Sequence, residues 1–160
     1  MEEISLTFNS KVREVKIFTG RYSLQNFSTY INDNYHSKVV ITNKTVWHIW
    51  KNYFEKNIKD FSLYQIEDGE RYKNYRTISR IYEFLLSIGA TRKTALIGFG
   101  GGVVGDITGF VASTYHRGIP LVHVPTTLLA QIDSSIGGKT GYNLKEGKNL
   151  IGTFYQPKFI

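Results

Sequence analysis

The sequence predicts a Rossmann-like α/β fold, a doubly wound and mostly parallel sheet preceded by a β-hairpin. The first observation is that short β-branched or aromatic runs alternate with helical patterns across residues 38–124, which is typical of parallel strands joined by crossover helices. The second is a glycine-rich turn between one such strand and the helix that follows it. The third is composition, because 160 residues that are 41% hydrophobic and 21% charged suit one globular domain.

The two periodicities of the hydrophobic pattern place the individual elements. Residues 3–8 and 13–18 alternate apolar and polar side chains, so they predict an antiparallel hairpin with its turn at Asn9 and Ser10. A helix is expected at about 22–33, and Gly89 suits the C-cap of a later helix. Further strands are expected at 38–42, 61–66, 94–99 and 119–124, and further helices at 45–56, 75–88 and 103–115.

The segment after Pro125 has a different character. It is rich in Thr, Ser, Gly, Lys and Asn, with a short apolar piece at 128–132, and residues 157–160 look like the start of another strand. A natural α/β chain does not usually end while opening a new element. We therefore expect residues 1–160 to be one N-terminal domain that is truncated at its C-terminus.

Composition excludes several classes of chemistry. The chain has no cysteine, which rules out disulfides, thiolate catalysis and cysteine zinc sites. Its start at Met1 is acidic and no long apolar run follows, so neither a signal peptide nor a membrane helix is expected and the cytoplasm is the expected location. No metal site is expected, because the four histidines lack metal-ligand spacing: His36, His48, His116 and His123.

The net charge of +7 allows three interpretations. A basic domain can bind nucleic acid, it can carry an excess of solvated lysine, or it can bind an anionic small molecule. The basic residues are scattered, with no run of five and no aromatic-basic signature of an RNA-binding module. We therefore keep nucleic-acid binding as the less favoured, non-enzymatic alternative.

The run Gly100–Gly105 satisfies G-x-G-x-x-G between an expected strand and helix. Glycines there let the backbone approach a pyrophosphate closely, while the helix N-terminus offers unpaired N–H groups and a positive dipole end. The usual dinucleotide fingerprint also needs an acid roughly 20 residues further on, and none lies between Asp106 and Asp133. Asn43, after an earlier strand, is suitably placed for a ribose instead. Asp106 either caps the helix or holds a ribose hydroxyl.

A second glycine-containing motif, Gly137–Thr140, ends in Gly-Lys-Thr but fails the P-loop pattern, because Asp133 occupies the position of the first glycine. Lys139 can still bind phosphate as a point charge. Asp133 either caps a turn beside Ser134 or accepts from a substrate hydroxyl.

Several blocks of sequence resemble the 3-dehydroquinate synthase family of sugar-phosphate cyclases in order and spacing. The resemblance covers residue 38 to the end and is most specific over the last sixty residues. The blocks are DGERYK at 68–73, GGGVVGDITGF at 100–110, YHRG at 115–118, VPTTLLAQ at 124–131, DSSIGGKT at 133–140 and GKNLIGTFYQP at 147–157.

The resemblance implies an NAD-dependent phosphate lyase of the shikimate pathway, which serves chorismate and aromatic amino acid biosynthesis. Such enzymes convert 3-deoxy-D-arabino-heptulosonate 7-phosphate, a phosphorylated sugar acid, to 3-dehydroquinate and phosphate. They are dimers with NAD in an N-terminal α/β domain and zinc or cobalt in a C-terminal helical domain. By resemblance, the NAD site comprises Asn43, Asp68, Glu70, Lys73, Gly101, Gly102, Val103, Gly105, Asp106, Thr126, Thr127, Lys139 and Lys148.

The substrate residues implied in the same way are Asp133, Lys139, Asn149 and Arg117, with Arg117 expected to reach the phosphate in a neighbouring subunit. The family's metal ligands, one glutamate and two histidines, lie beyond the end of this chain, so we expect residues 1–160 alone to be inactive. The alternative within the enzyme class is a cyclase that makes deoxyinosose- or valiolone-type rings. A metal-dependent polyol dehydrogenase is a more distant relative.

Overall fold

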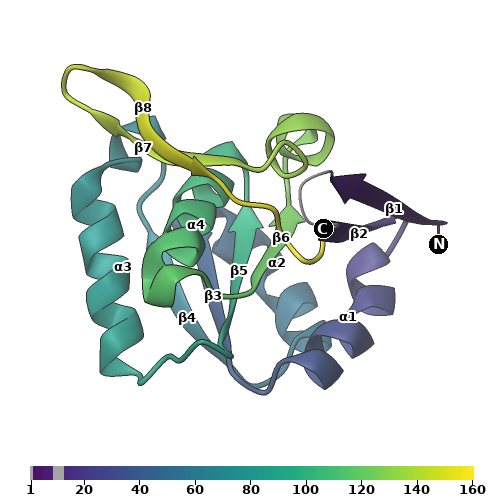
Figure 1. The fold of residues 1–160 in the computed structure, drawn as a ribbon. Coiled ribbons are helices and arrows are strands. Elements are labelled where there is room, and N and C mark those ends of the chain that lie inside the picture. The colour runs from purple at the N-terminus through teal and green to yellow at the C-terminus, as the bar shows by residue number, and fades with distance from the viewer. Residues whose placement is uncertain (1, 9–12) are drawn as a thin grey trace.

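The structure is a computed structural model that describes residues 2–8 and 13–160. Figure 1 shows a central sheet covered by helices on both faces. Four parallel strands have the order β4-β3-β5-β6. They are β3 (Lys38–Asn43), β4 (Phe61–Ile66), β5 (Ala95–Gly100) and β6 (Leu121–Pro125), which confirms the predicted fold class.

Two hydrophobic clusters hold the layers together, one on each face of the sheet. Val40 packs in the cluster of α1 (Ser23–Asn34) and α2 (Lys44–Asn57), whereas Val39 and Ile41 pack in the cluster of α3 and α4. Because successive strand side chains point to opposite faces, a strand buried on both faces must be apolar at consecutive positions. This explains why residues 39–41 read as an unbroken β-branched run.

The helices α3 (Tyr75–Ser87) and α4 (Gly102–Thr114) lie within two residues of their expected bounds. Gly89 has a φ of +66°, and the N–H groups of Gly89 and Ala90 donate to the carbonyls of Leu86 and Leu85 at 3.1 and 2.9 Å. This is the paired bonding of a Schellman motif, so the predicted glycine C-cap is confirmed. A short 3₁₀ helix, η1 (Glu70–Tyr72), precedes α3, and another, η2 (Tyr115–Arg117), follows α4.

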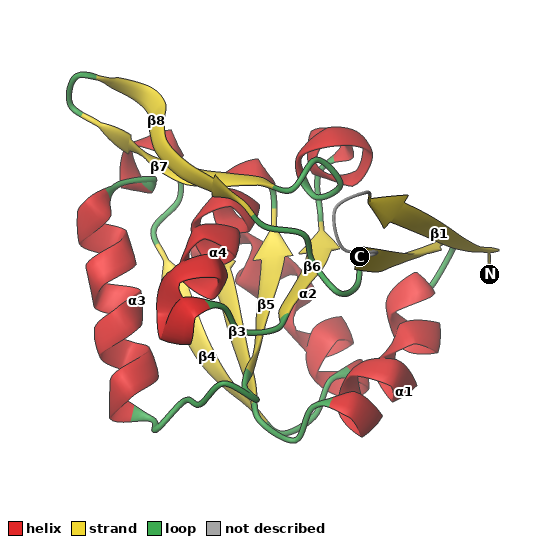
Figure 2. Cartoon of the chain, in the orientation of Figure 1, coloured by secondary structure: helices red, strands yellow, loops and turns green. Residues whose placement is uncertain are grey.

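The N-terminal hairpin is confirmed in β1 (Glu2–Phe8) and β2 (Arg13–Thr19), although its turn lies outside the described residues. Phe159 makes parallel bridges to both β2 and β6, so the predicted start of another strand is also confirmed. The Phe18 N–H donates to the Ile160 carbonyl at 2.8 Å, and the His123 N–H donates to the Phe159 carbonyl at 3.0 Å. The end of the chain therefore joins the hairpin to the parallel sheet, as Figure 2 shows.

The segment after Pro125 is more ordered than its composition indicates. A π-helical turn, η3 (Ala130–Ser134), precedes an antiparallel hairpin of β7 (Lys139–Leu144) and β8 (Gly147–Phe154), which the sequence analysis did not identify. The hairpin crosses α4 where Gly109 faces Thr140, and a Cβ on Gly109 would collide with the Thr140 methyl group. Within the hairpin, a Cβ on Gly152 would collide with the Thr140 carbonyl. Glycine is therefore required for the close approach of these backbones.

Candidate functional site

The strand order creates one topological switch point, between β3 and β5. The chain leaves β3 toward β4 on one side and returns to form β5 on the other side. In open α/β sheets, ligands bind outside the carboxyl ends of the strands at such a point. The glycine turn follows β5 and Asn43 ends β3, so both predicted cofactor segments lie at this crevice.

The glycine turn leaves the amino end of α4 open. Gly101 is the N-cap residue and no side chain caps this helix end, so its amide groups and positive dipole end are available to an anion. A Cβ on Gly101 would lie 3.1 Å from the Thr127 Cγ2, whereas one on Gly102 would meet only Ser134, at 3.4 Å. Thr127 also receives a hydrogen bond from the Ala130 N–H at 3.3 Å, which fixes the next turn of the chain.

Two buried hydroxyls at the ends of the strands lack a hydrogen-bond partner. They are Oγ1 of Thr42, at the end of β3, and Oγ1 of Thr126, directly after β6. The Thr126 N–H donates to the Gly100 carbonyl at 3.0 Å, so this threonine lies beside the glycine turn. Because an unpaired buried hydroxyl is unfavourable, a polar ligand in the crevice would satisfy groups that the fold leaves unpaired. The residues present therefore fit a dinucleotide.

A buried ion pair lies behind the glycine turn. Lys73 is 4% exposed, and its Nζ donates to the Asp106 carboxylate and, at 2.6 Å, to Oδ1 of Asn149. Burial raises the pKa of the Asp106 carboxyl, and the Lys73 ammonium opposes this shift. Asp106 does not cap α4, because it lies in the second turn of that helix and its carboxylate faces Lys73. The capping alternative is therefore wrong.

A cavity of about 450 Å³ brings together four of the predicted residues. It lies between α4 and the β7–β8 hairpin. Its charged and amide side chains come from four different elements, namely Asp106 on α4, Asp133 on η3, Lys139 on β7 and Asn149 on β8. Carboxylates, an ammonium and an amide around one cavity suit a ligand with both hydroxyl and anionic groups.

A second groove lies on the other side of the same hairpin and has a volume of about 700 Å³. Glu70, Lys73 and Lys148 line it, and the Asn143 side chain forms hydrogen bonds that join η1 to the hairpin. The Asn143 Nδ2 donates to Glu70 Oε1 at 2.7 Å, and its Oδ1 accepts from the Asn149 N–H at 2.9 Å. The sequence analysis did not identify Asn143 or Thr42, because an isolated Asn or Thr in a strand carries no motif.

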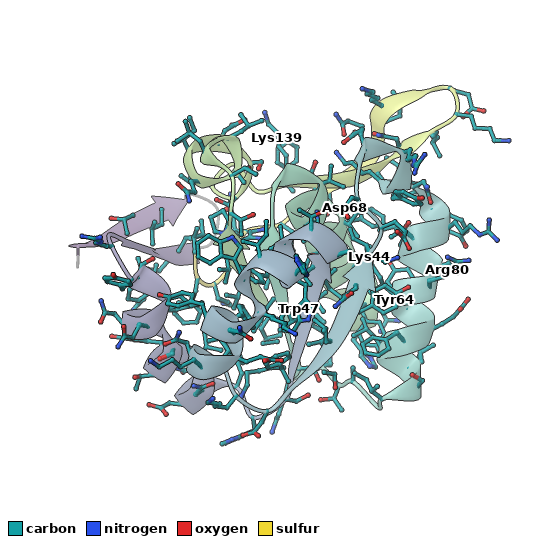
Figure 3. The ribbon with its side chains drawn as sticks, turned by 180° about the vertical axis from the view of Figure 1, so that it is seen from behind. Lys44, Trp47, Tyr64, Asp68, Arg80 and Lys139 are labelled. Atoms are coloured by element: carbon teal, nitrogen blue, oxygen red, sulfur yellow. The ribbon has the colours of Figure 1, made fainter. Side chains whose placement is uncertain are left out.

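Other predicted residues have local partners. Asn43 Oδ1 accepts from the Val46 N–H at 2.9 Å, so this side chain caps α2. Asp68 directly follows Glu67, which forms an ion pair of 2.6 Å with Lys44 just past the end of β4. Figure 3 labels Lys44 and Asp68 in the view from behind. Arg117 lies just past the carboxyl end of α4, about 20 Å from the glycine turn for a helix of this length. The structure does not bring Arg117 to the cavity of its own chain.

Metal ligands do not gather in the part of the chain that the structure describes, where no group of three or more His, Cys, Asp or Glu could hold an ion. His123 is buried near the glycine turn, and desolvation lowers its pKa to about 4, so it is neutral at physiological pH. Within residues 2–8 and 13–160, no helix is both long enough and apolar enough to cross a bilayer.

The parallel sheet with its switch-point turn and the cavity beneath the β7–β8 hairpin define an α/β domain with a Rossmann-like fold. Residues 63–160 match the family model described as 3-dehydroquinate synthase N-terminal. The chain therefore belongs to the 3-dehydroquinate synthase family. A 3-dehydroquinate synthase of Dictyoglomus thermophilum is 46% identical over 160 residues, and one of Campylobacter hominis is 52% identical over 123 residues.

The chain spans less than half the length of these curated relatives, 44% of the first and 36% of the second, with 100% and 76% of this chain covered. Among solved structures, a 2-deoxy-scyllo-inosose synthase complexed with carbaglucose-6-phosphate, NAD⁺ and Co²⁺ is 32% identical with a TM-score of 0.85. A 2-epi-5-epi-valiolone synthase of Streptomyces hygroscopicus with NAD⁺ and Zn²⁺ is 27% identical with a TM-score of 0.79. This chain covers 44% and 43% of those chains, which cover 99% and 96% of it.

Proposed function

We propose that residues 1–160 form the NAD-binding domain of a 3-dehydroquinate synthase. The whole enzyme would convert 3-deoxy-D-arabino-heptulosonate 7-phosphate to 3-dehydroquinate and phosphate, in the cytoplasm. The observation that carries the proposal is the cavity beside the glycine turn, where Asp106, Asp133, Lys139 and Asn149 meet. The alternative is a deoxyinosose- or valiolone-type cyclase, which the similarity to solved structures favours. The higher identity to curated 3-dehydroquinate synthases favours the main proposal.

The glycine turn would hold the dinucleotide. Gly101, Gly102 and Val103 offer backbone amides to the pyrophosphate, and Gly105 keeps the next turn of α4 free of a side chain. Thr126 has an unpaired hydroxyl for a ribose or phosphate oxygen, and Thr127 braces the turn. Asn43, Asp68, Glu70 and Lys148 would complete the site around the adenosine and ribose groups.

Bound NAD would supply a reversible hydride acceptor, which makes the substrate C–H next to the oxidised carbon acidic enough for phosphate to leave. The chain's own residues then bind and orient. Lys139 and Asn149 would donate to the phosphate oxygens, and Asp133 would accept from a substrate hydroxyl. Lys73 would keep Asp106 ionised by pairing with it, so that this carboxylate accepts a hydrogen bond from a hydroxyl of the ligand.

The metal and the subunit contact of the whole enzyme would lie outside this cavity. We also propose that the zinc or cobalt of the whole enzyme binds to ligands outside this chain, which spans 44% of the Dictyoglomus thermophilum relative. We also propose a homodimer in which Arg117 reaches the substrate phosphate of the partner. This role suits an exposed arginine at the far end of α4 from its own cavity.

Calorimetric titration of the 160-residue chain with NAD, up to millimolar concentrations, tests the cofactor assignment. Saturable binding of one NAD per chain is the expected result. Lys139 lines the cavity and is assigned by resemblance to NAD as well as to the substrate, so Lys139→Ala should weaken NAD binding, whereas Lys93→Ala, at an exposed position after α3, should not. If NAD does not bind at millimolar concentration, or if both variants bind as the parent chain does, the proposed site is wrong.

A further inference from the structure

A second basic surface lies at the amino end of α3, next to the groove that Glu70, Lys73 and Lys148 line, and Arg71 and Arg76 border both. Three arginines line a cavity of about 360 Å³ there, together with Tyr72, Asn74 and Thr77. The lining includes no carboxylate. Arg76 and Arg80 are one helical turn apart on α3, and Arg71 lies just before the helix, on η1. Figure 3 shows Arg80 on this helix near Tyr64 and far from Lys139.

The three guanidinium groups are not neutralised by the fold. Among the described residues, the side-chain ion pairs join Lys44 to Glu67 and Lys73 to Asp106, and none includes these arginines. Arg71 instead lies over the ring of Tyr72, with 4.8 Å between its Cζ and the ring centroid. Like charges one turn apart on a helix repel each other, so the arrangement is unfavourable without an anion.

The helix end itself needs no ligand, because Asn74 already caps it. Its Oδ1 accepts from the Thr77 N–H at 3.1 Å, and its Nδ2 donates to the Arg71 carbonyl at 2.7 Å. These bonds fix the backbone that carries Arg71 beside the first turn of α3. The guanidinium groups, rather than the helix dipole, therefore provide the recognition chemistry.

We propose that this arginine cluster, Arg71, Arg76 and Arg80, binds a diphosphate group, either as free inorganic diphosphate or as the diphosphate of a nucleotide. A guanidinium group can donate two parallel hydrogen bonds to two phosphate oxygens. One phosphate group carries a charge of about −1.5 to −2, which leaves one of three guanidiniums unmatched, whereas two linked phosphates match all three. The 360 Å³ of the cavity is also about ten times the ~30 Å³ that a water occupies in the liquid, which is ample for the larger anion.

Calorimetry of the 160-residue chain with inorganic diphosphate at low ionic strength tests the proposal. With NAD present at saturation to occupy the glycine turn, we expect one saturable site for inorganic diphosphate. Arg76→Gln with Arg80→Gln should weaken binding at this site at least about tenfold, because charge-assisted bonds are lost. The matched control is Arg92→Gln with Lys93→Gln, which removes the same two charges from exposed positions after α3. The control should bind as the parent chain does. Equal loss in both variants would show only a general effect of net charge and would overturn the proposal.

Further titrations distinguish the sources of the diphosphate and the competing sites. If ADP binds as tightly as inorganic diphosphate and AMP binds more weakly, the source is a nucleotide. If inorganic diphosphate binds and ADP does not, the source is the free anion. Saturating NAD should leave diphosphate binding to the arginine cluster unchanged, because the proposed NAD site is at the glycine turn. Displacement of diphosphate by NAD would assign the arginines to the cofactor site. If single-stranded RNA bound more tightly than diphosphate, and if Arg76→Gln with Arg80→Gln weakened RNA binding equally, the surface would be a nucleic-acid site. Either result would overturn the proposal, provided that thermal unfolding shows that the variants fold.

Discussion

Lys73 connects the two sides of the candidate site at the scale of single residues. It contacts Asp106, which is 33 positions away in the sequence, and Asn149, which is 76 positions away. Resemblance assigned Lys73 and Asp106 to the cofactor and Asn149 to the substrate, but nothing in the sequence indicated that the three side chains touch. Such a contact depends on the folded arrangement of η1, α4 and β8. A sequence motif can therefore identify the residues of this site without giving the bonds between them.

Replacing Lys73 by Met should destabilise the chain by about 3 kcal/mol near pH 7, because it leaves the buried Asp106 carboxylate without its cation. Burial raises the folded-state pKa of Asp106 above its unfolded value, and the substitution should raise it further. The carboxyl is then protonated as pH falls through the raised pKa, so the destabilisation should shrink toward acid pH. Denaturant unfolding from pH 4 to 8 measures this, with Lys73→Met/Asp106→Asn as the control. A loss independent of pH would contradict the ion-pair explanation.

Gly102 tests whether the glycine turn binds the cofactor. It does not have a positive φ, and an added Cβ would come no closer than 3.4 Å to Ser134, so Gly102→Ala should fold normally. Gly102→Val should still unfold cooperatively. Both should weaken NAD binding, and Val more than Ala, because the added carbons occupy the space of the pyrophosphate. Calorimetry and thermal unfolding together measure the two effects. Unchanged NAD affinity in a folded Val variant would mean that the glycines form only a turn.

At the scale of elements, periodicity predicted the alternation of strands and helices because the central strands β3 and β5 are buried on both faces, whereas helices such as α3 are buried on one. It did not predict the β7–β8 hairpin. Most side chains of β8 are exposed, so the strand lacks an apolar face, and its partner β7 approaches α4 through small residues. The bonds that anchor the hairpin run from Asn143 to Glu70 and from Thr153 to Ser113, which are distant in sequence. Polar anchoring of this kind leaves no periodic signal.

The hairpin should therefore detach when its close contact with α4 is blocked. Gly109→Ala places a methyl group against Thr140 and should cost about 1–3 kcal/mol, as overpacking does. Hydrogen exchange should show faster exchange in β7 and β8 while β3 and β5 keep their protection. Gly137→Ala is the matched control, since its added carbon would lie 3.5 Å from the nearest heavy atom, the Asp133 carbonyl. Equal protection in parent and Gly109→Ala chains would show that the hairpin does not depend on this contact.

At the scale of the whole molecule, α4 separates the two proposed sites. Its amino end opens on the crevice proposed for NAD, and its carboxyl end leads to Arg117, which is exposed and has a φ of +63°. Arg117→Ala should therefore leave the NAD affinity of the 160-residue chain unchanged within about twofold, because about 20 Å separates the two helix ends. Calorimetry with NAD measures this, and a large loss of affinity would place Arg117 in the cofactor site instead of at a subunit contact.

The 160-residue chain should release no phosphate from 3-deoxy-D-arabino-heptulosonate 7-phosphate, even with NAD and zinc or cobalt present. The cavity presents Lys139 and Asn149 for the phosphate, but the described residues include no cluster of ligands for a metal. Binding without a metal-held substrate would lack the orientation that the reaction needs. A coupled assay for phosphate release measures turnover, with the longer relative from Dictyoglomus thermophilum, 46% identical, as the positive control. Metal-dependent turnover by the pure chain would mean that these residues hold the metal themselves, and the division of the site between two domains would then be wrong.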